Sequence, residues 1–303
     1  MQKIVPHLWF DKEAGEAAEF YMSLFADSKI KDTITLSGTP SGTVEILTVE
    51  LAGQEFMFLS AGPYFKFTPA VSFLIVCNTV AEAEMFWENL VNQGTVLMEL
   101  GSYPFSERYG WVQDKYGLSW QIMYIGEGPV TQKIISKLMF VGKECGKTEE
   151  AIGFYTSLFH NSEIGDIYRY GENETPDKPG TVANVSFKLE NQEFAAMDSA
   201  HAHEFSFNEA ISFVVNCKDQ AEIDYYWEKL SADREAEQCG WLKDKYGLSW
   251  QIVPEDMNDY MRHKDPDQLK QVTEVMLNMK KLNIHELKRA YETTKPSNSK
   301  DKF

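Results

Sequence analysis

The residues with the clearest capacity for chemistry form one dense polar cluster in the second half of this chain. Asp198, His201, His203 and Glu209 lie close together in the sequence. Histidine can bind a metal or act as a general base near neutral pH, and the two rings of a His-x-His segment share a face if the segment is a strand. The surrounding residues are more typical of a connecting loop. Two interpretations therefore stay open, a ligand-contacting site and a solvated loop.

A second set of candidates combines amides with aromatic rings. Gln121 and Gln251 each follow a tryptophan near the end of a strand-like run. An amide that points into a cavity can donate and accept hydrogen bonds, although a structural glutamine bonded to backbone fits the pattern equally well. Trp111 and Trp241 add surface that can stack on a planar or cationic ligand, unless they belong to the core.

These candidates recur because the chain repeats itself. Eleven of thirteen residues are identical between Gly110–Ile122 and Gly240–Ile252, and Phe20–Phe25 resembles Phe154–Phe159. Matches in the same order along both halves predict two copies of one fold. We therefore divide the chain into domains at residues 1–128 and 129–254, followed by a tail at 255–303.

Apolar periodicity predicts the same elements twice within each half. In the first half, a strand at 4–10 and a helix at 14–25 precede strands at 30–36, 43–51 and 55–59. The order then restarts with a strand at 71–77, a helix at 80–91 and strands near 96–100, 108–113 and 118–124. The sequence therefore predicts four consecutive β-α-β-β-β units along the chain.

The tail follows a different pattern, which predicts two helices. Asp265 and Pro266 are a favourable helix start, and Asn283 can cap a second helix. Leu269, Val272, Met276 and Met279 fall on one face, as expected for a packing surface. The pattern leaves open whether this surface covers a pocket or packs on the outside of the protein.

The charge balance restricts the possible partners. The chain carries 29 basic and 46 acidic residues, a net charge of −17. Such a surface repels nucleic acids and anionic membranes and favours neutral or cationic ligands. No apolar run approaches the roughly 20 residues of a membrane-spanning helix, and the N-terminus lacks the pattern of a signal peptide. We expect a cytoplasmic protein.

The repeated motif resembles a known family. Trp241–Ile252, Phe207–Ser212 and Tyr225–Leu230 are similar to segments of the PhnB-like branch of the vicinal-oxygen-chelate superfamily, the glyoxalase/bleomycin-resistance fold. The resemblance implies an α+β fold of tandem glyoxalase-like domains. In each domain, two β-α-β-β-β modules would form a cupped, incomplete barrel, and the chain would end in a helical tail.

The resemblance also implies where a divalent metal would bind. The corresponding positions are His7, Val71, Gln121 and Leu59 or Ser60 in the first half, and Lys137, Ile211, Gln251 and Met197 or Asp198 in the second. Glutamine is a poor ligand for a hard cation, and lysine is itself cationic. We therefore expect no metal cofactor, with a shifted site using His7 and Gln121 as the alternative.

Our leading functional hypothesis is a PhnB-like protein that binds a small molecule at a degenerate metal site. The predicted ligand-binding residues are Gln251, Trp241, Lys137, Asp198, His203, Gln121 and Trp111. A metal-dependent glyoxalase or dioxygenase is one alternative. The family label 3-demethylubiquinone-9 3-methyltransferase is a weaker one, since the chain has no glycine-rich turn of the kind that holds S-adenosylmethionine. A purely structural module is a third. Whether the protein is an enzyme stays open, as does the choice between a monomeric pseudo-dimer and a homodimer.

Overall fold

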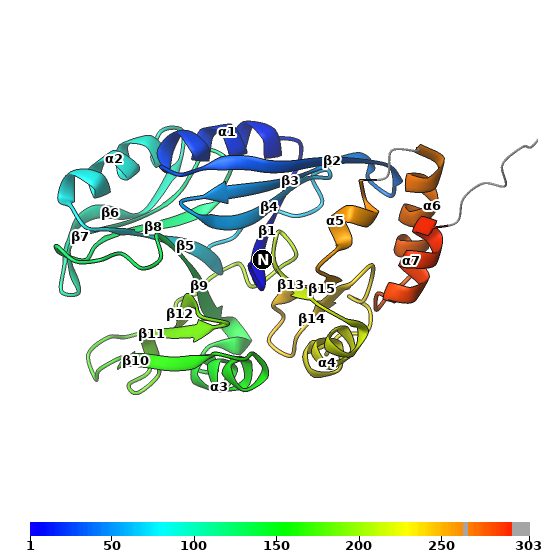
Figure 1. Cartoon of the computed structure of the whole chain (residues 1–303). Helices are drawn as coiled ribbons and strands as arrows, with labels where there is room; N and C mark the ends of the chain where they lie inside the picture. Colours follow the sequence, from blue (N-terminus) through cyan, green and yellow to red (C-terminus); the bar gives the residue numbers. More distant parts are fainter. Residues whose placement is uncertain (263–265, 293–303) are drawn as a thin grey trace, which may run out of the picture.

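The computed structural model describes residues 1–262 and 266–292, and within them the strands form two large mixed sheets (Figure 1). Sheet A runs in the order β14 (Trp241–Lys243), β15 (Ser249–Pro254), β13 (Ile211–Cys217), β1 (Ile4–Phe10), β4 (Gln54–Ser60), β3 (Gly42–Leu51) and β2 (Lys29–Thr39). Sheet B runs in the order β10 (Glu163–Arg169), β11 (Val182–Leu189), β12 (Gln192–Ser199), β9 (Ile134–Val141), β5 (Val71–Cys77), β8 (Ser119–Tyr124), β7 (Ser106–Gln113) and β6 (Thr95–Tyr103). The predicted α+β class with tandem glyoxalase-like modules is confirmed.

Each sheet joins one module from each half of the chain. β1 pairs antiparallel with β13, with His7 opposite Ser212, and β5 pairs antiparallel with β9, with Ser72 opposite Lys137. The resemblance implied that the two modules of one half form a cup together. In the structure, each sheet instead combines one module of the first half with one of the second. Pairing across the halves satisfies the backbone groups of strand edges that would otherwise stay open.

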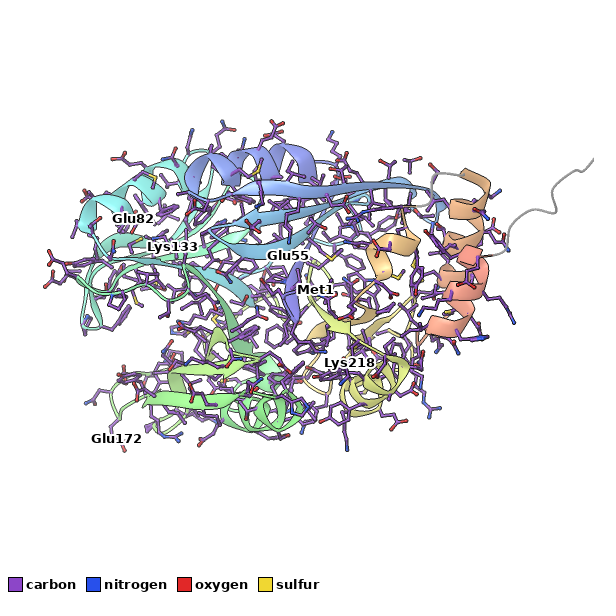
Figure 2. The ribbon with its side chains drawn as sticks, in the orientation of Figure 1. Met1, Glu55, Glu82, Lys133, Glu172 and Lys218 are labelled. Atoms are coloured by element: carbon purple, nitrogen blue, oxygen red, sulfur yellow. The ribbon has the colours of Figure 1, made fainter. Side chains whose placement is uncertain are left out.

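Matched ion pairs reinforce this seam between the halves. Lys133, just before β9, lies 2.6 Å from Glu82 on the first-half helix that follows β5, and Figure 2 shows the two side by side. Lys3, just before β1, is likewise 2.6 Å from Glu222 in the second half. Each lysine also donates to a backbone carbonyl of the partner strand. The two copies therefore cross-link each other in the same way.

Four amphipathic helices cover the outer faces of the sheets. They are α1 (Ala14–Leu24), α2 (Val80–Leu90), α3 (Thr148–Leu158) and α4 (Gln220–Leu230), and a short 3-10 turn, η1 (Gly142–Glu144), precedes α3. Thr79 and Asp219 cap α2 and α4 by accepting hydrogen bonds from the backbone N–H groups of Glu82 and Glu222. We call the sheet faces that point away from these helices the inner faces.

The two modules of each half meet through their outer faces, around a buried aspartate. Asp114 accepts hydrogen bonds from the Tyr21 hydroxyl at 2.6 Å and the Trp120 indole at 2.8 Å, and also from two backbone N–H groups. Asp244 accepts the equivalent bonds from Tyr155 and Trp250 at 2.7 and 2.9 Å. Burial raises the pKa of both carboxyls, while these hydrogen bonds oppose that shift. Both aspartates are structural.

The tail packs on sheet A. It forms α5 (Met257–Tyr260), α6 (Pro266–Leu277) and α7 (Ile284–Glu292), and Figure 1 shows these helices beside β2 and β14, on the side of the molecule away from sheet B. Asn283 caps α7 as predicted, by accepting from the backbone N–H of Glu286. The other predicted cap, Asp265, lies outside the described residues. No helix among the described residues is long and apolar enough to cross a membrane.

The tail also completes the edge of sheet A. The second half has no described strand corresponding to β6, and the backbone N–H groups of Cys239 and Gly240 donate instead to the carbonyls of Met279 and Lys280. Gly240 has a φ of +87°, and a Cβ there would lie 3.0 Å from the Ile252 carbonyl oxygen and 3.2 Å from Leu282. Glycine therefore permits the close approach of the tail to β14.

Candidate functional site

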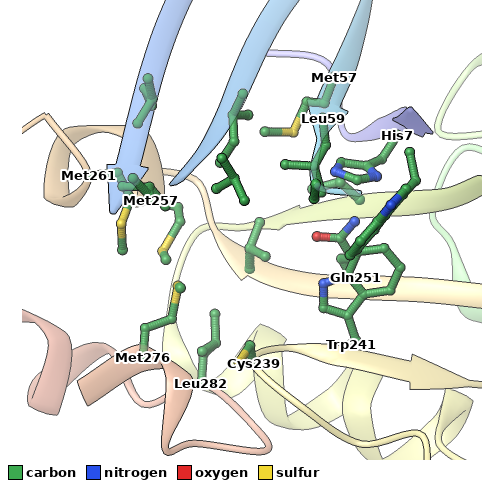
Figure 3. Close-up of a pocket in the computed structure, with 18 of the residues that line it drawn as sticks. His7, Met57, Leu59, Cys239, Trp241, Gln251, Met257, Met261, Met276 and Leu282 are labelled. Atoms are coloured by element: carbon green, nitrogen blue, oxygen red, sulfur yellow. The ribbon is translucent and has the colours of Figure 1, made fainter. Parts of the chain in front are cut away.

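A cavity of about 500 Å³ lies between the inner face of sheet A and the tail (Figure 3). Most of its walls are aliphatic or thioether side chains. They include Ile34, Leu36, Val44, Ile46, Met57 and Leu59 from the strands, and Met257, Met261, Met276 and Leu282 from the tail. A concave, mainly apolar space with a few polar groups is the usual form of a small-molecule site. Methionine walls add adaptability, because the side chain is flexible and polarizable.

His7 is the main titratable group buried at the cavity wall. It lies on β1, is only 4% exposed, and its Nδ1 atom has no hydrogen-bond partner among the described residues. Burial lowers its pKa to about 3, so the imidazole is neutral at physiological pH. Its ring meets that of Trp241 edge-on, with centroids 5.3 Å apart. His7 can therefore exchange hydrogen bonds with a ligand but brings no positive charge to it.

Gln251 offers the cavity a free acceptor. Its amide nitrogen donates to the Ser212 hydroxyl at 3.0 Å, whereas its oxygen accepts no hydrogen bond from the described residues and points into the cavity in Figure 3. The equivalent Gln121 on sheet B donates to Ser72 at 2.9 Å and also accepts from the Tyr109 hydroxyl at 2.8 Å. The carbonyl oxygen of Gln121 is therefore already engaged by Tyr109, while that of Gln251 is available to a ligand.

Trp241 differs from its counterpart in the same way. In sheet B the Trp111 indole donates to the Ser119 hydroxyl at 2.8 Å. In sheet A the corresponding Ser249 hydroxyl is buried without a partner, and the Trp241 indole N–H makes no hydrogen bond with the described residues. Trp9 lines the same wall, 6.2 Å from the Trp241 ring. The cavity therefore presents a free N–H donor beside a free carbonyl acceptor.

Comparison with known proteins places the chain in a family. The family model described as 3-demethylubiquinone-9 3-methyltransferase matches it twice, at residues 2–123 and 132–253. The chain belongs to this family. No curated protein matches it.

The solved structures that are similar to this chain align over either less than half of it or most of it. A putative 3-demethylubiquinone-9 3-methyltransferase, PhnB protein, from Bacillus cereus is 40% identical and aligns over 41% of this chain and 99% of its own, with a TM-score of 0.38. Glyoxalase I from Zea mays is 10% identical over 86% of this chain and 98% of its own, with a TM-score of 0.52. The likeness to glyoxalase I shows the shared fold alone, and the resemblance inferred from the sequence is confirmed.

The metal positions of the glyoxalase fold carry unsuitable side chains in this family member. The inner face of sheet A presents His7, Ser212 and Gln251, and Leu59 takes the fourth position. Sheet B presents Lys137, Ser72, Gln121 and Met197. One imidazole among neutral or apolar groups does not fit a divalent cation, which needs roughly three strong protein ligands. The described residues contain no group of three His, Cys, Asp or Glu side chains arranged to hold a metal.

Two details of the predicted metal positions need correction. The inward residues are Ser72 and Ser212, not Val71 and Ile211, because each serine hydroxyl accepts from an inner-face glutamine. Alternation along a strand then directs the neighbouring aliphatic residue to the core. The alternative pair of His7 and Gln121 is not brought together, since His7 lies in sheet A and Gln121 in sheet B.

The polar cluster of the second half lies outside the cavity lining, except for Glu209. Asp198 is buried and accepts hydrogen bonds from the backbone N–H of Gly146 and from the backbone and hydroxyl of Thr148, which anchors the start of α3. His203 is 2.8 Å from the Ser199 hydroxyl in a loop. This arrangement agrees with the loop interpretation of the cluster.

Among the predicted site residues, the structure brings Gln251 and Trp241 together with His7, and places Lys137, Gln121 and Trp111 on sheet B. Sequence reasoning missed the tail methionines and Leu282 as walls of the site. Of these, only Met276 belonged to the predicted packing surface, for which the sequence left open whether it covers a pocket. The helix that carries Met276 packs on β2, more than 200 residues earlier in the chain.

Proposed function

We propose that this protein binds a small, mainly apolar molecule, neutral or cationic, in the cavity between sheet A and the tail. The observation that carries the proposal is the pair of free polar groups, the Gln251 carbonyl and the Trp241 indole N–H, within otherwise apolar walls. Both atoms are accessible from the cavity and make no hydrogen bond with the described residues, so a ligand with one donor and one acceptor would complete this site.

Charge around the cavity supports a neutral or cationic ligand. The described lining residues include Glu55, Glu209, Glu235 and Glu255 but no lysine or arginine. Lys31 pairs with Glu55 and Lys243 with Glu209, whereas no lysine or arginine of the described part of the chain pairs with Glu235 or Glu255. Together with the net charge of −17, these groups make the cavity unfavourable for an anion.

The same residues favour binding over turnover. His7 has a pKa of about 3 and is a weak general base at neutral pH, where efficient catalysts have a pKa near 7. The donor set does not suit glyoxalase-type metal chemistry, for the reasons given above. The sequence also lacks a glycine-rich turn suited to a methyl-donor nucleotide. We therefore propose a binding or sequestering role without a metal cofactor.

The test uses a neutral fluorescent probe, N-phenyl-1-naphthylamine, which has an apolar body and one N–H donor. We expect saturable binding that Gln251→Leu weakens about tenfold, the value of one hydrogen bond of roughly 1.4 kcal/mol. Trp241→Phe keeps the aromatic surface and removes only an N–H for which this probe has no acceptor, so it should change the affinity less than Gln251→Leu does. Trp111→Phe is the matched control on sheet B and leaves the affinity unchanged.

A cavity-filling variant separates this site from other apolar surfaces. Met276→Trp adds bulk to the tail wall and is expected to abolish probe binding while the melting temperature stays within a few degrees of the wild type. Undiminished binding by a folded Met276→Trp protein would exclude the cavity as the site. Native mass spectrometry of freshly purified protein would then identify any retained molecule.

A further inference from the structure

The inner face of sheet B carries a lysine where sheet A carries His7. Lys137 lies on the central strand β9, directly opposite Ser72 on β5 and Ala195 on β12. Directly opposed residues in a sheet point to the same side, and Ser72 accepts a hydrogen bond from the inner-face Gln121. Leu138, the next residue on the strand, is in the core. Lys137 therefore projects from the inner face.

The charge of Lys137 has no partner in the described part of the chain. Within residues 1–262 and 266–292, no hydrogen-bond acceptor or carboxylate pairs with its Nζ atom. Lys133, four residues earlier, shows the contrast, because it pairs with Glu82 and donates to the Val76 carbonyl. The Lys137 side chain is half-buried, and burial alone lowers its pKa to about 8. At neutral pH it is still mostly an ammonium group, in a place where burial makes a lone charge unfavourable.

The side chains around Lys137 on the inner face are polar or apolar but provide no compensating carboxylate. Ser72, Gln121 and the Tyr109 hydroxyl form one hydrogen-bonded chain beside it. Other titratable groups on the strands of this face are Glu193 on β12, which accepts from Thr131, and the exposed Tyr168 on β10. Lys188 on β11, opposite Glu193, and Glu163 on β10 also lie on this face, and they pair with each other at 2.8 Å. No carboxylate contributes to the Lys137 pKa shift.

Nothing described on the tail covers this face. α6 and α7 lie beside sheet A, whereas β6–β8 and β10–β12 bend around the inner face of sheet B from two sides in Figure 1. α2 and α3 pack on the outer side of the sheet, so their acidic residues do not face Lys137.

We propose that the inner face of sheet B is a second ligand site, in which Lys137 pairs with the carboxylate of a small organic acid. The anion supplies the charge that Lys137 lacks, and charge-assisted hydrogen bonds are among the strongest in proteins. The partly exposed Trp111, opposite Gln121, provides aromatic surface for the body of the acid. The two cups thus differ in the charge of the ligand they accept, although the protein as a whole is acidic.

Protonation couples to this binding. A bound carboxylate stabilises the ammonium form and raises the pKa of Lys137. Affinity is therefore constant between about pH 5, above which the carboxylate is ionised, and about pH 7. It decreases up to tenfold per unit of pH above about pH 8, as the free amine loses its proton. An ion pair with an ordinary surface lysine would persist to about pH 10.

The experiment compares three probes of one shape by ligand-observed NMR on the full chain: benzoate, benzamide and benzylamine. We expect benzoate to bind at least tenfold more tightly than the other two at pH 7. Lys137→Met abolishes the preference for benzoate, and Lys137→Arg keeps the preference but removes its decrease between pH 7.5 and 9.5. His7→Leu, at the matching position of sheet A, leaves benzoate binding unchanged.

Two results would overturn the proposal. One is equal affinity for benzoate and benzamide at pH 7. The other is benzoate binding that survives Lys137→Met in a folded protein, which circular dichroism would establish. Neither result bears on probe binding in the cavity of sheet A, so the two sites can fail independently.

Discussion

The inner faces of sheets A and B are built from the same repeated unit, yet they present different chemistry. Sheet A has the neutral His7, the free carbonyl of Gln251 and the free indole N–H of Trp241, all closed in by the tail. Among the described residues, Lys137 on sheet B has no partner, Gln121 uses both its amide nitrogen and its carbonyl oxygen in hydrogen bonds, and no tail helix covers the inner face. The outer faces, by contrast, match almost atom for atom around Asp114 and Asp244.

This difference distinguishes residues that stabilise the fold from residues that are available to a ligand. The buried aspartates hold two modules together in each half, so both copies need the same residues. The inner faces do not form this contact between modules, so their side chains can differ between the two copies without disturbing the packing of the modules. The positions where the copies differ are therefore the best guide to ligand chemistry, and the following changes test that comparison.

The largest effect is expected where the halves are alike. Asp114→Ala and Asp244→Ala each leave a tyrosine hydroxyl, an indole N–H and two backbone N–H groups buried without an acceptor. We expect each change to lower the free energy of unfolding by about 4 kcal/mol. Urea denaturation measures both variants. If the loss of unfolding free energy in one variant were more than twice that in the other, the two outer faces would not be equivalent.

The tail provides the next largest contrast. Leu282 is 1% exposed and packs between Gly240 and the cavity. Leu282→Ala is expected to cost about 3 kcal/mol of stability and to weaken the naphthylamine probe by enlarging the cavity. Leu158→Ala removes the same isopropyl group from the hydrophobic core of the second half, away from the cavity, and should leave the affinity for the probe unchanged. Equal effects of the two changes on the probe would mean that the tail is no wall of the site.

His7 makes the stability of sheet A depend on pH. Its pKa is about 3 in the folded protein and 6.5 in the reference state, so its contribution is complete above pH 6.5 and is lost as pH decreases toward 3. Between pH 7.5 and 5.0 we expect a loss of about 2 kcal/mol that is absent in His7→Leu. Urea titrations at the two pH values measure it, and His203→Gln controls for the loop histidine. The same loss in His7→Leu would place the titrating group elsewhere.

Lys137 should have the opposite effect on stability. Its pKa of about 8 lies below the reference value of 10.5, so the charged form destabilises the folded state below pH 8, and this penalty disappears above pH 10.5. Lys137→Met is therefore expected to stabilise the protein by about 2 kcal/mol at pH 7, allowing for water at a half-buried ammonium, and by about half as much at pH 9.5. Destabilisation at pH 7 would show that the ammonium has a partner in the folded chain.

The smallest effect compares two serines at matching positions. Ser119→Ala removes the acceptor of the Trp111 indole and should cost about 1 kcal/mol. Ser249→Ala removes a buried hydroxyl that has no partner, so we expect no loss or a slight gain in stability. Thermal unfolding of the two variants distinguishes these outcomes. An equal cost would indicate that the Trp241 indole bonds Ser249 and is not free for a ligand.

The sequence by itself determined the repeat, the β-α-β-β-β order and the family, because each depends on local periodicity and on motifs that recur along the chain. It also predicted Gln251 and Trp241 as ligand-binding residues from their types and positions in strand-like runs, and both line the cavity. It placed His7 and Gln121 together only because one half was assumed to close its own cup.

Only the tertiary structure decided which modules share a sheet, because the pairing of β1 with β13 joins strands about 200 residues apart and leaves no local signal. The same limit applies to the contrast between the two glutamines. Tyr109 stands beside Gln121, whereas Cys239 takes the matching place in the second half and contacts the Leu277 carbonyl instead. Whether a polar atom is free depends on such neighbours in space, and the chain brings them together only when it folds.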